Sequence, residues 1–229
     1  MKKFTSISVL ATPEPTWFHK SPQKSSWASW LIQSNHYGSI TEIGPKQIID
    51  TSAGDFFIVL QGCVTVSCIA PDRQKSVFVD ALRSGDIIWS LNQNSVVFEY
   101  ETRTMTVLLK VPKRMHAEFN TGISYYETVL MAGELDLMTK HSLATQYHFA
   151  NPVDRVSRVI NILVQHPEAF SGPRGIEVHA SKEDIRRLAG LERRLSTQAF
   201  KTLEGDGTVN FNGYKTFFYR ETVQAQANA

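Results

Sequence analysis

Two patterns of hydrophobic and polar positions follow one another along the chain and divide it near residue 111. Before that point, short apolar runs are separated by turn residues such as Gly44-Pro45 and Ser84-Gly85-Asp86. Short runs bounded by turns at this spacing predict a β-sandwich or jelly-roll barrel. The expected strands are Ser39–Ile43, Gln47–Thr51, Phe56–Leu60, Cys63–Ile69, Ser76–Leu82, Ile87–Ser90, Val96–Glu101 and Thr104–Val111.

Helical spacing is expected on both sides of this barrel. Before it, residues 25–33 place Trp27, Trp30 and Leu31 on one side of a short helix, and residues 1–24 form a partly ordered extension. After it, residues 112–149 carry apolar side chains at steps of three and four, which predicts one long helix.

The long helix is expected to mediate dimerisation. It would extend for about 50 Å, which is more than one small barrel can cover. Part of its apolar stripe is therefore expected to pack against a second copy of the chain in a coiled-coil-like seam. The residues expected in this seam are Tyr126, Leu130, Gly133, Leu137, His141 and Ala144.

A third helix and a loop follow the long helix. Asn151-Pro152 breaks the helical pattern, and Pro152 suits the first turn of a new helix that runs to Gln165. Residues 166–175 are expected to form a loop. The apolar residues expected on the inner side of this helix are Val153, Val156, Ile160 and Leu163.

The stretch from Ser181 to Tyr219 has the pattern of a winged helix-turn-helix. Ser181 and Asp184 predict a helix start, because a serine oxygen accepts a first-turn amide and a carboxylate suits that end. Gly190 ends this helix, since glycine accepts the left-handed conformation that a tight turn needs. The short runs Val209–Phe211 and Thr216–Tyr219 flank Asn212-Gly213, a strong hairpin signal; Asn212 and Lys215 are placed in this wing.

The second helix of this module runs from about Glu192 to Glu204 and is expected to enter the major groove of DNA, which accommodates a helix. Five lysines and arginines against one acid, Glu192, between Arg186 and Lys201 favour a phosphate partner. The inner stripe is expected to be Leu195, Ala199 with Phe200, and Leu203. The side chains expected to point outward are Arg193, Arg194, Thr197, Gln198 and Lys201.

Composition narrows the class of protein. The chain has 229 residues, 42% hydrophobic residues and a net charge of +2, which indicates a soluble globular protein whose basic character is local. No apolar run approaches the roughly 20 residues of a membrane helix. The two cysteines fit a reducing cytoplasm. The fold class is therefore predicted as α+β, with an extension (1–24), a barrel (25–111), a dimerisation helix (112–149) and a DNA-binding domain (150–229).

Catalytic and metal sites are not expected. An iron–sulfur cluster usually needs four cysteine ligands, and the chain has only Cys63 and Cys68. At least one of them is expected to be a small core residue, and a redox thiol is the alternative. His141 and His148 share a helix face, where packed or solvated histidines are favoured over a pH-sensing or haem-binding role. No nucleophile–base pair stands out, so neither an enzyme nor a cofactor or metal is expected.

Four segments resemble the cyclic-AMP receptor protein / fumarate-nitrate regulator (CRP/FNR) family of transcription factors. They are FFIVLQGCVTVSC at 56–68, LRSGDIIW at 82–89, DRVSRVINILVQHPEAF at 154–170, and the whole stretch 175–219. The resemblance covers about residues 25–220. It implies a cytoplasmic homodimer that binds double-stranded DNA at a palindromic operator, with RNA polymerase as a further partner.

The resemblance also assigns roles to individual residues. Arg193 occupies the position that contacts guanine, while Arg194 stands where a glutamate is frequent and Gln198 where a second base-reading arginine is found. The operator is therefore expected to differ from that of the cyclic-AMP receptor protein. Ser181 stands where a hydroxyl touches a phosphate, and Asn212 and Lys215 are expected to touch the flanking backbone.

The barrel departs from the nucleotide-binding pattern of that family. Trp89-Ser90 stand where a Gly-Glu pair begins the phosphate-binding cassette, and Asn94-Ser95 where an Arg-Ser pair ends it. The cation for a cyclic phosphate and the carboxylate for a ribose hydroxyl are thus missing, so binding of cyclic AMP is not expected. Two alternatives stay open: a regulator gated by a small molecule or redox signal in an altered pocket, and a cupin-like enzyme or interaction module.

Overall fold

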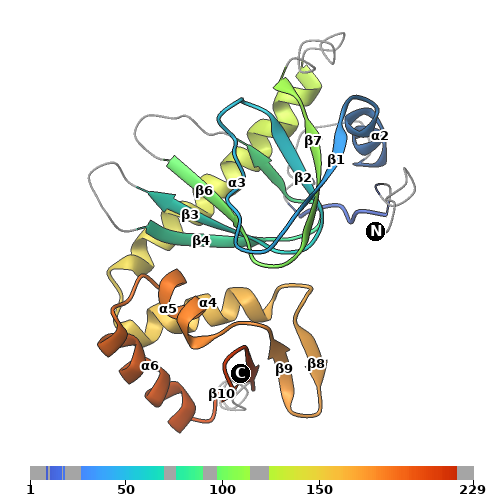
Figure 1. Cartoon of the computed structure of the whole chain (residues 1–229). Helices are drawn as coiled ribbons and strands as arrows, with labels where there is room; N and C mark the ends of the chain where they lie inside the picture. Colours follow the sequence, from blue (N-terminus) through green and yellow to red (C-terminus); the bar gives the residue numbers. More distant parts are fainter. Residues whose placement is uncertain are drawn as a thin grey trace, which may run out of the picture. The chain divides into compact units, whose positions relative to one another are not determined.

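The structure is a computed structural model that describes Val9, residues 11–16, Phe18 and residues 27–69, 76–89, 97–113 and 124–220. The chain separates into two compact units, an N-terminal unit (1–74 and 79–142) and a C-terminal unit (75–78 and 143–229). Each unit is described by itself (Figure 1). No helix within these residues is long and apolar enough to span a membrane.

Two antiparallel sheets form the N-terminal unit, as the strand pattern predicted. One sheet has the order β1-β7-β2-β5 and the other the order β4-β3-β6. Phe56, Phe57, Ile58 and Val59 of β2 are all buried, because this strand is covered on both faces. The bounds are β1 Ser39–Ile43, β2 Phe56–Gln61, β3 Val64–Ile69, β4 Ser76–Leu82, β5 Ile87–Trp89, β6 Val97–Thr102 and β7 Thr106–Val111.

One expected strand is absent. Gln47–Thr51 forms only an isolated bridge between Ile48 and Glu101. Its backbone pairing with β6 is short: the Ile49 amide donates to the Tyr100 carbonyl at 2.9 Å and the Thr102 amide to the Gln47 carbonyl at 2.9 Å. Thr102 Oγ1 also accepts from the Gln47 amide at 2.9 Å and donates to the Gly44 carbonyl at 2.6 Å. The buried Thr102 hydroxyl thus competes for the Gln47 amide, and the pairing with β6 stays limited to a bridge.

Aromatic packing fixes helix α2 (Trp27–Tyr37) to the barrel. Trp27 and Trp30 stack at 5.1 Å between ring centroids, and Trp30 lies 6.0 Å from Phe56 of β2. Leu31 completes the buried side of the helix. The predicted helix and its three inner residues are confirmed, and the helix continues four residues beyond the predicted end at 33.

The long helix α3 is described from Ser124 to His148 and runs beside the barrel sheets in Figure 1. Residues 114–123 of the predicted helix lie outside the described residues, and Pro112 is not helical. Val129 is buried in the core cluster that contains Trp30 and Ile58, and Leu130 packs against it. The barrel thus covers part of the apolar stripe of α3.

In its described residues, the C-terminal unit contains the end of α3, the helices α4, α5 and α6, and an antiparallel sheet of order β10-β11-β9-β8. The predicted winged helix-turn-helix is confirmed in its helices and its hairpin. Its elements are α4 Pro152–Val164, β8 Phe170–Gly172, β9 Gly175–Val178, α5 Lys182–Leu188, α6 Arg193–Gly205, β10 Val209–Asn212 and β11 Thr216–Tyr219.

The loop predicted over residues 166–175 is wrong in its second half. Phe170 pairs with Glu177 and Gly172 with Gly175, so β8 and β9 form a hairpin. The pattern hid this strand because β8 lies at the edge of the sheet and Phe170 is 67% exposed. In α4, Val156, Ile160 and Leu163 are buried as predicted, whereas Val153 is half-buried.

Candidate nucleic-acid interface

A capping box begins α5. Ser181 Oγ accepts from the Asp184 amide at 3.0 Å, and Asp184 Oδ2 accepts from the Ser181 amide at 3.0 Å. Two otherwise unpaired first-turn donors are thereby satisfied. The predicted helix start at Ser181 is confirmed, and this side chain is only half-buried.

Two arginines hold the turn between α5 and α6. Arg155 of α4 donates from Nη2 to the carbonyl oxygens of Ala189 at 2.5 Å and Gly190 at 3.0 Å. Arg186 of α5 donates from Nη1 to the Leu191 carbonyl at 2.9 Å. Gly190 has a φ of 61°, and a Cβ there would lie 2.9 Å from Arg155 Nη2. Glycine is therefore needed both for the backbone conformation and for the arginine.

Hydrogen bonding within this turn determines which basic side chains remain available to a ligand. Burial lowers the pKa of the Arg155 guanidinium, which nevertheless stays protonated at any working pH. Arg186 also pairs with Glu183, and this hydrogen bond lowers the pKa of the Glu183 carboxyl. Arg186 therefore serves the turn, and the basic residues that α6 itself exposes are Arg193, Arg194 and Lys201.

Helix α6 presents a polar face. The five side chains predicted to point outward are all exposed, which confirms that prediction: Arg193, Arg194, Thr197, Gln198 and Lys201. The exposed Thr197 hydroxyl donates to the Arg193 carbonyl at 2.7 Å, and its oxygen can still accept a hydrogen bond. These side chains offer cationic, amide and hydroxyl groups along one helix surface.

The inner stripe of α6 differs from the prediction at one position. Leu195 is 41% exposed, whereas Ser196 is 1% exposed and belongs to the buried face with Ala199, Phe200 and Leu203. Ser196 is tolerated there because its hydroxyl donates to the Arg193 carbonyl at 3.0 Å. The buried positions 196, 199, 200 and 203 follow helical periodicity more closely than steps of four do. The sequence pattern did not indicate this face because Ser196 is polar.

Aromatic and charged contacts join α6 to the wing. Phe200 of α6 lies 5.2 Å from Phe211 of β10, measured between ring centroids. Lys182 bonds Glu204 at 2.9 Å and also lies 4.6 Å from the Phe211 ring. The start of α5, the end of α6 and the wing are thus held in one arrangement.

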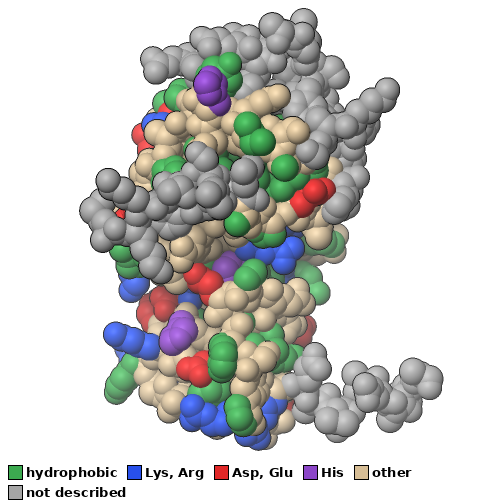
Figure 2. All heavy atoms as spheres, turned by 90° about the vertical axis from the view of Figure 1, so that its right-hand side faces the viewer, with side chains coloured by type: hydrophobic (Ala, Val, Ile, Leu, Met, Phe, Trp, Pro, Cys, Tyr) green, Lys and Arg blue, Asp and Glu red, His purple; other side chains and the backbone are tan. Residues whose placement is uncertain are grey.

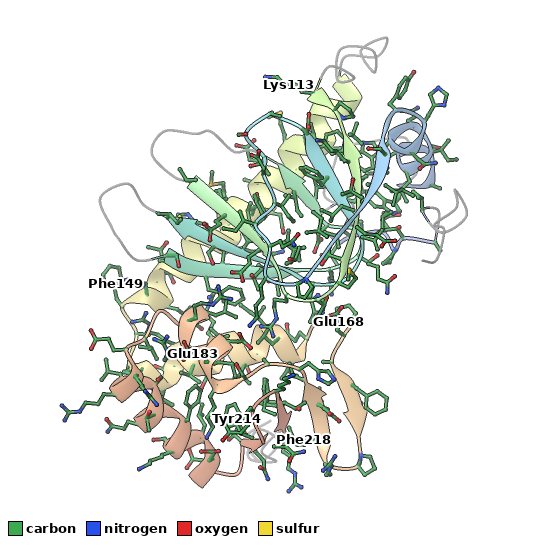
Figure 3. The ribbon with its side chains drawn as sticks, viewed as in Figure 1. Lys113, Phe149, Glu168, Glu183, Tyr214 and Phe218 are labelled. Carbon is green, nitrogen blue, oxygen red and sulfur yellow. The ribbon has the colours of Figure 1, made fainter. Side chains whose placement is uncertain are left out.

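The wing exposes a polar apex. β10 and β11 pair antiparallel, and Asn212 opposite Thr216 closes the hairpin. Asn212 and Lys215 are exposed, as a backbone-contacting role requires. Between them stands Tyr214, which Figure 3 labels and which the sequence analysis did not single out. Its side chain is 94% exposed. Its position inside a turn, directly before Lys215, was the available signal.

Basic side chains are prominent at this end of the C-terminal unit. In Figure 2, lysine and arginine side chains gather at its lower end. Arg174, in the β8–β9 turn, lies 4.2 Å from the centre of the Phe218 ring, and its carbonyl accepts from Arg220 Nε at 3.1 Å. This turn therefore carries fixed positive charge near β11.

The residues predicted for the dimer seam do not share one exposed face. Leu137 is 8% and Ala144 1% exposed within the single chain, so neither is available to a partner. Leu130 and Gly133 are half-buried, and the side chain of Tyr126 lies outside the described residues. Part of the stripe at steps of three and four is therefore covered within the single chain, and the seam itself stays a prediction.

His141, also assigned to the seam, lies against the barrel. Its ring packs edge-to-face on Phe98 of β6 at 5.7 Å between centroids. Burial lowers the pKa of the His141 imidazole. This placement confirms the expectation of a packed histidine.

Ser90, Asn94 and Ser95 and the side chain of Trp89 lie outside the described residues. Cys63 and Cys68 are unbridged and buried, which confirms the prediction of small core residues. Burial raises the pKa of the Cys68 thiol.

Comparison with known proteins finds similar sequences among bacterial proteins. No protein-family model matches the chain. The CRP-like protein Clp of Xanthomonas euvesicatoria pv. vesicatoria is 24% identical over 179 residues, which cover 73% of this chain and 76% of the relative.

Solved structures share the fold. The c-di-GMP-responsive global regulator CLP of Xanthomonas campestris matches with a TM-score of 0.67 and 21% identity, over 84% of this chain and 99% of the other. A CRP/FNR-family transcriptional regulator from Thermus thermophilus matches with a TM-score of 0.57 and 14% identity, over 80% and 94%.

Proposed function

We propose that this chain is a transcriptional regulator of the CRP/FNR type, a homodimer that binds a palindromic operator through α6. The role is regulatory rather than enzymatic, and a regulator that binds DNA and meets RNA polymerase acts in the cytoplasm.

The observation that carries the proposal is the outer face of α6. Arg193, Arg194 and Gln198 are exposed on a helix that directly follows the turn held by Arg155 and Arg186. A guanidinium group can donate two hydrogen bonds to guanine, and a glutamine amide can pair with adenine in the same manner. Lys201 and the wing residues Asn212 and Lys215 suit phosphate contacts, which position the protein without reading sequence.

In a two-fold dimer, the partner protomer contributes a second α6, which would bind the other half-site. Exposed apolar residues of α3, Met131 at 65% and Leu135 at 70%, support a seam on the side of the helix opposite to Leu137. A homodimer of this kind places two α6 helices in successive major grooves, with half-sites about one helical turn apart.

We propose that operator binding does not require cyclic AMP. Burial of a cyclic phosphate is costly without a paired cation, and Asn94 and Ser95 carry no charge. A solved relative is described as responsive to c-di-GMP, which makes this dinucleotide the second effector to test.

Selection of bound sequences from random duplexes tests the proposal. The purified chain should enrich a palindrome and bind it about a thousandfold or more tighter than a scrambled duplex, as specific regulators do. Enrichment of no sequence would contradict the proposal. Transcription in vitro from a promoter that carries the palindrome then shows whether RNA polymerase is recruited or blocked, and parallel titrations with cyclic AMP and c-di-GMP identify an effector.

A further inference from the structure

Leu195 stands out on α6 as an apolar side chain among polar ones. It lies in the first turn of the helix and is 41% exposed. Arg194 precedes it, and Gln198 follows three residues later on the adjacent helix surface, both of them exposed.

Leu195 is not part of the buried face of α6. The buried face of α6 is completed by Ser196, whose hydroxyl is satisfied within the helix. A single exposed leucine is ordinary on a protein surface. Its location is informative, because the N-terminal residues of a recognition helix approach the base edges of the major groove most closely.

We propose that Leu195 is a specificity-determining residue that contacts the C5-methyl group of a thymine in each half-site. This inference rests on the proposed function. The thymine methyl is the apolar group that the major groove displays, and apolar side chains recognise it by contact. Gln198 and Arg194, on the neighbouring surface, supply the hydrogen-bond donors for the adjoining bases. The three side chains together would read a short block that contains a thymine.

Replacement of thymine by deoxyuridine removes only the methyl group and leaves every hydrogen-bonding group of the base pair unchanged. Each thymine of the selected operator is replaced in turn, symmetrically in both half-sites, and binding is measured by fluorescence anisotropy. At one thymine position the parent should lose about fourfold in affinity per half-site, the change expected when one methyl group is no longer buried.

The variant Leu195→Ala should bind the parent operator more weakly and should bind the thymine and deoxyuridine duplexes at that position equally. Leu195→Met should keep the preference for thymine, because it retains an apolar side chain of similar size. Alanine is a strong helix former and Leu195 is partly exposed, so α6 should remain folded, as circular dichroism can verify.

The outcomes separate the two proposals. If the parent binds the selected operator no better than a scrambled duplex, the proposed function fails and this inference fails with it. If specific binding is intact but no thymine is sensitive to loss of its methyl group, only the role of Leu195 is overturned. The same holds if Leu195→Ala keeps the full preference for thymine.

Discussion

Lys140 of α3 is joined to Asp80 of β4 by an ion pair with 2.7 Å between Nζ and Oδ2. The same Nζ lies 2.7 Å from Oδ2 of Asp136, one turn earlier on α3. Burial lowers the pKa of Lys140, but the two carboxylates raise it by more, so the net pKa lies above its ordinary value. The Lys140–Asp80 pair therefore connects α3 to the barrel strand β4, and it does so through protein side chains alone.

Removal of this lysine should destabilise the N-terminal unit. Lys140→Met leaves Asp80 and Asp136, whose side chains are 18% and 17% exposed, without their cation. We expect a loss of about 1–2 kcal/mol, less than for a fully buried pair because Lys140 itself is 36% exposed. Urea unfolding measures it. Lys113→Met, at an exposed position, is the control and should change stability by under about 0.5 kcal/mol. Equal effects of the two substitutions would refute a role for the pair.

His141 gives the stability of the chain a dependence on pH. Burial beside Phe98 lowers its pKa in the folded state, so the unfolded chain binds the proton more tightly. The contribution of His141 is then fully present above the unfolded pKa of about 6.5 and is lost as pH falls through the folded pKa. His141→Gln should therefore have a shallower decline in unfolding free energy between pH 7 and pH 5 than the parent. An unchanged slope would show that this histidine does not contribute.

Glutamate substitutions on α3 can test which face of this helix contacts the partner protomer. Met131→Glu with Leu135→Glu should yield folded monomers, because both positions are exposed in the single chain. Leu137→Glu should instead lower stability by several kcal/mol, since it buries a carboxylate. Light scattering separates monomer from dimer, and a double variant that stays dimeric would exclude this seam.

Base contacts and phosphate contacts on α6 should respond differently to substitution. Arg193→Ala should cost about 1–3 kcal/mol on the selected operator and little on scrambled DNA, if the guanidinium binds a base edge. Lys201→Ala should weaken both duplexes alike and reduce the slope of log K against log salt by about one. Anisotropy titrations over a range of salt concentrations measure both. An Arg193→Ala variant with the parent's affinity would remove this residue from the site.

Much of the fold could be read from local pattern, because turns and apolar periodicity act over a few residues. β1 and β4 have the predicted bounds, and the Gly190 turn and the Ser181 cap were evident from residue type alone. The strand β8 was missed because an edge strand needs no buried alternation.

Less of the candidate site than of the fold could be predicted from the sequence. The outward residues of α6 follow from helical spacing. The exposure of Leu195 does not, because it depends on tertiary packing that buries Ser196 in place of Leu195. The structural use of Arg186 also arises from a contact, with the Leu191 carbonyl, that composition cannot show. For the same reason, apolar steps of three and four on α3 could not distinguish the side covered by the barrel from the side left exposed.

The most direct test of the account is one titration of the ligand-free protein, dialysed free of nucleotides, against its selected operator and a scrambled duplex of equal length. We expect binding to the operator about a thousandfold or more tighter at physiological salt, with no added cyclic nucleotide. Equal affinity for the two duplexes would contradict DNA recognition by α6, and specific binding that appears only after cyclic AMP is added would contradict the independence from that nucleotide.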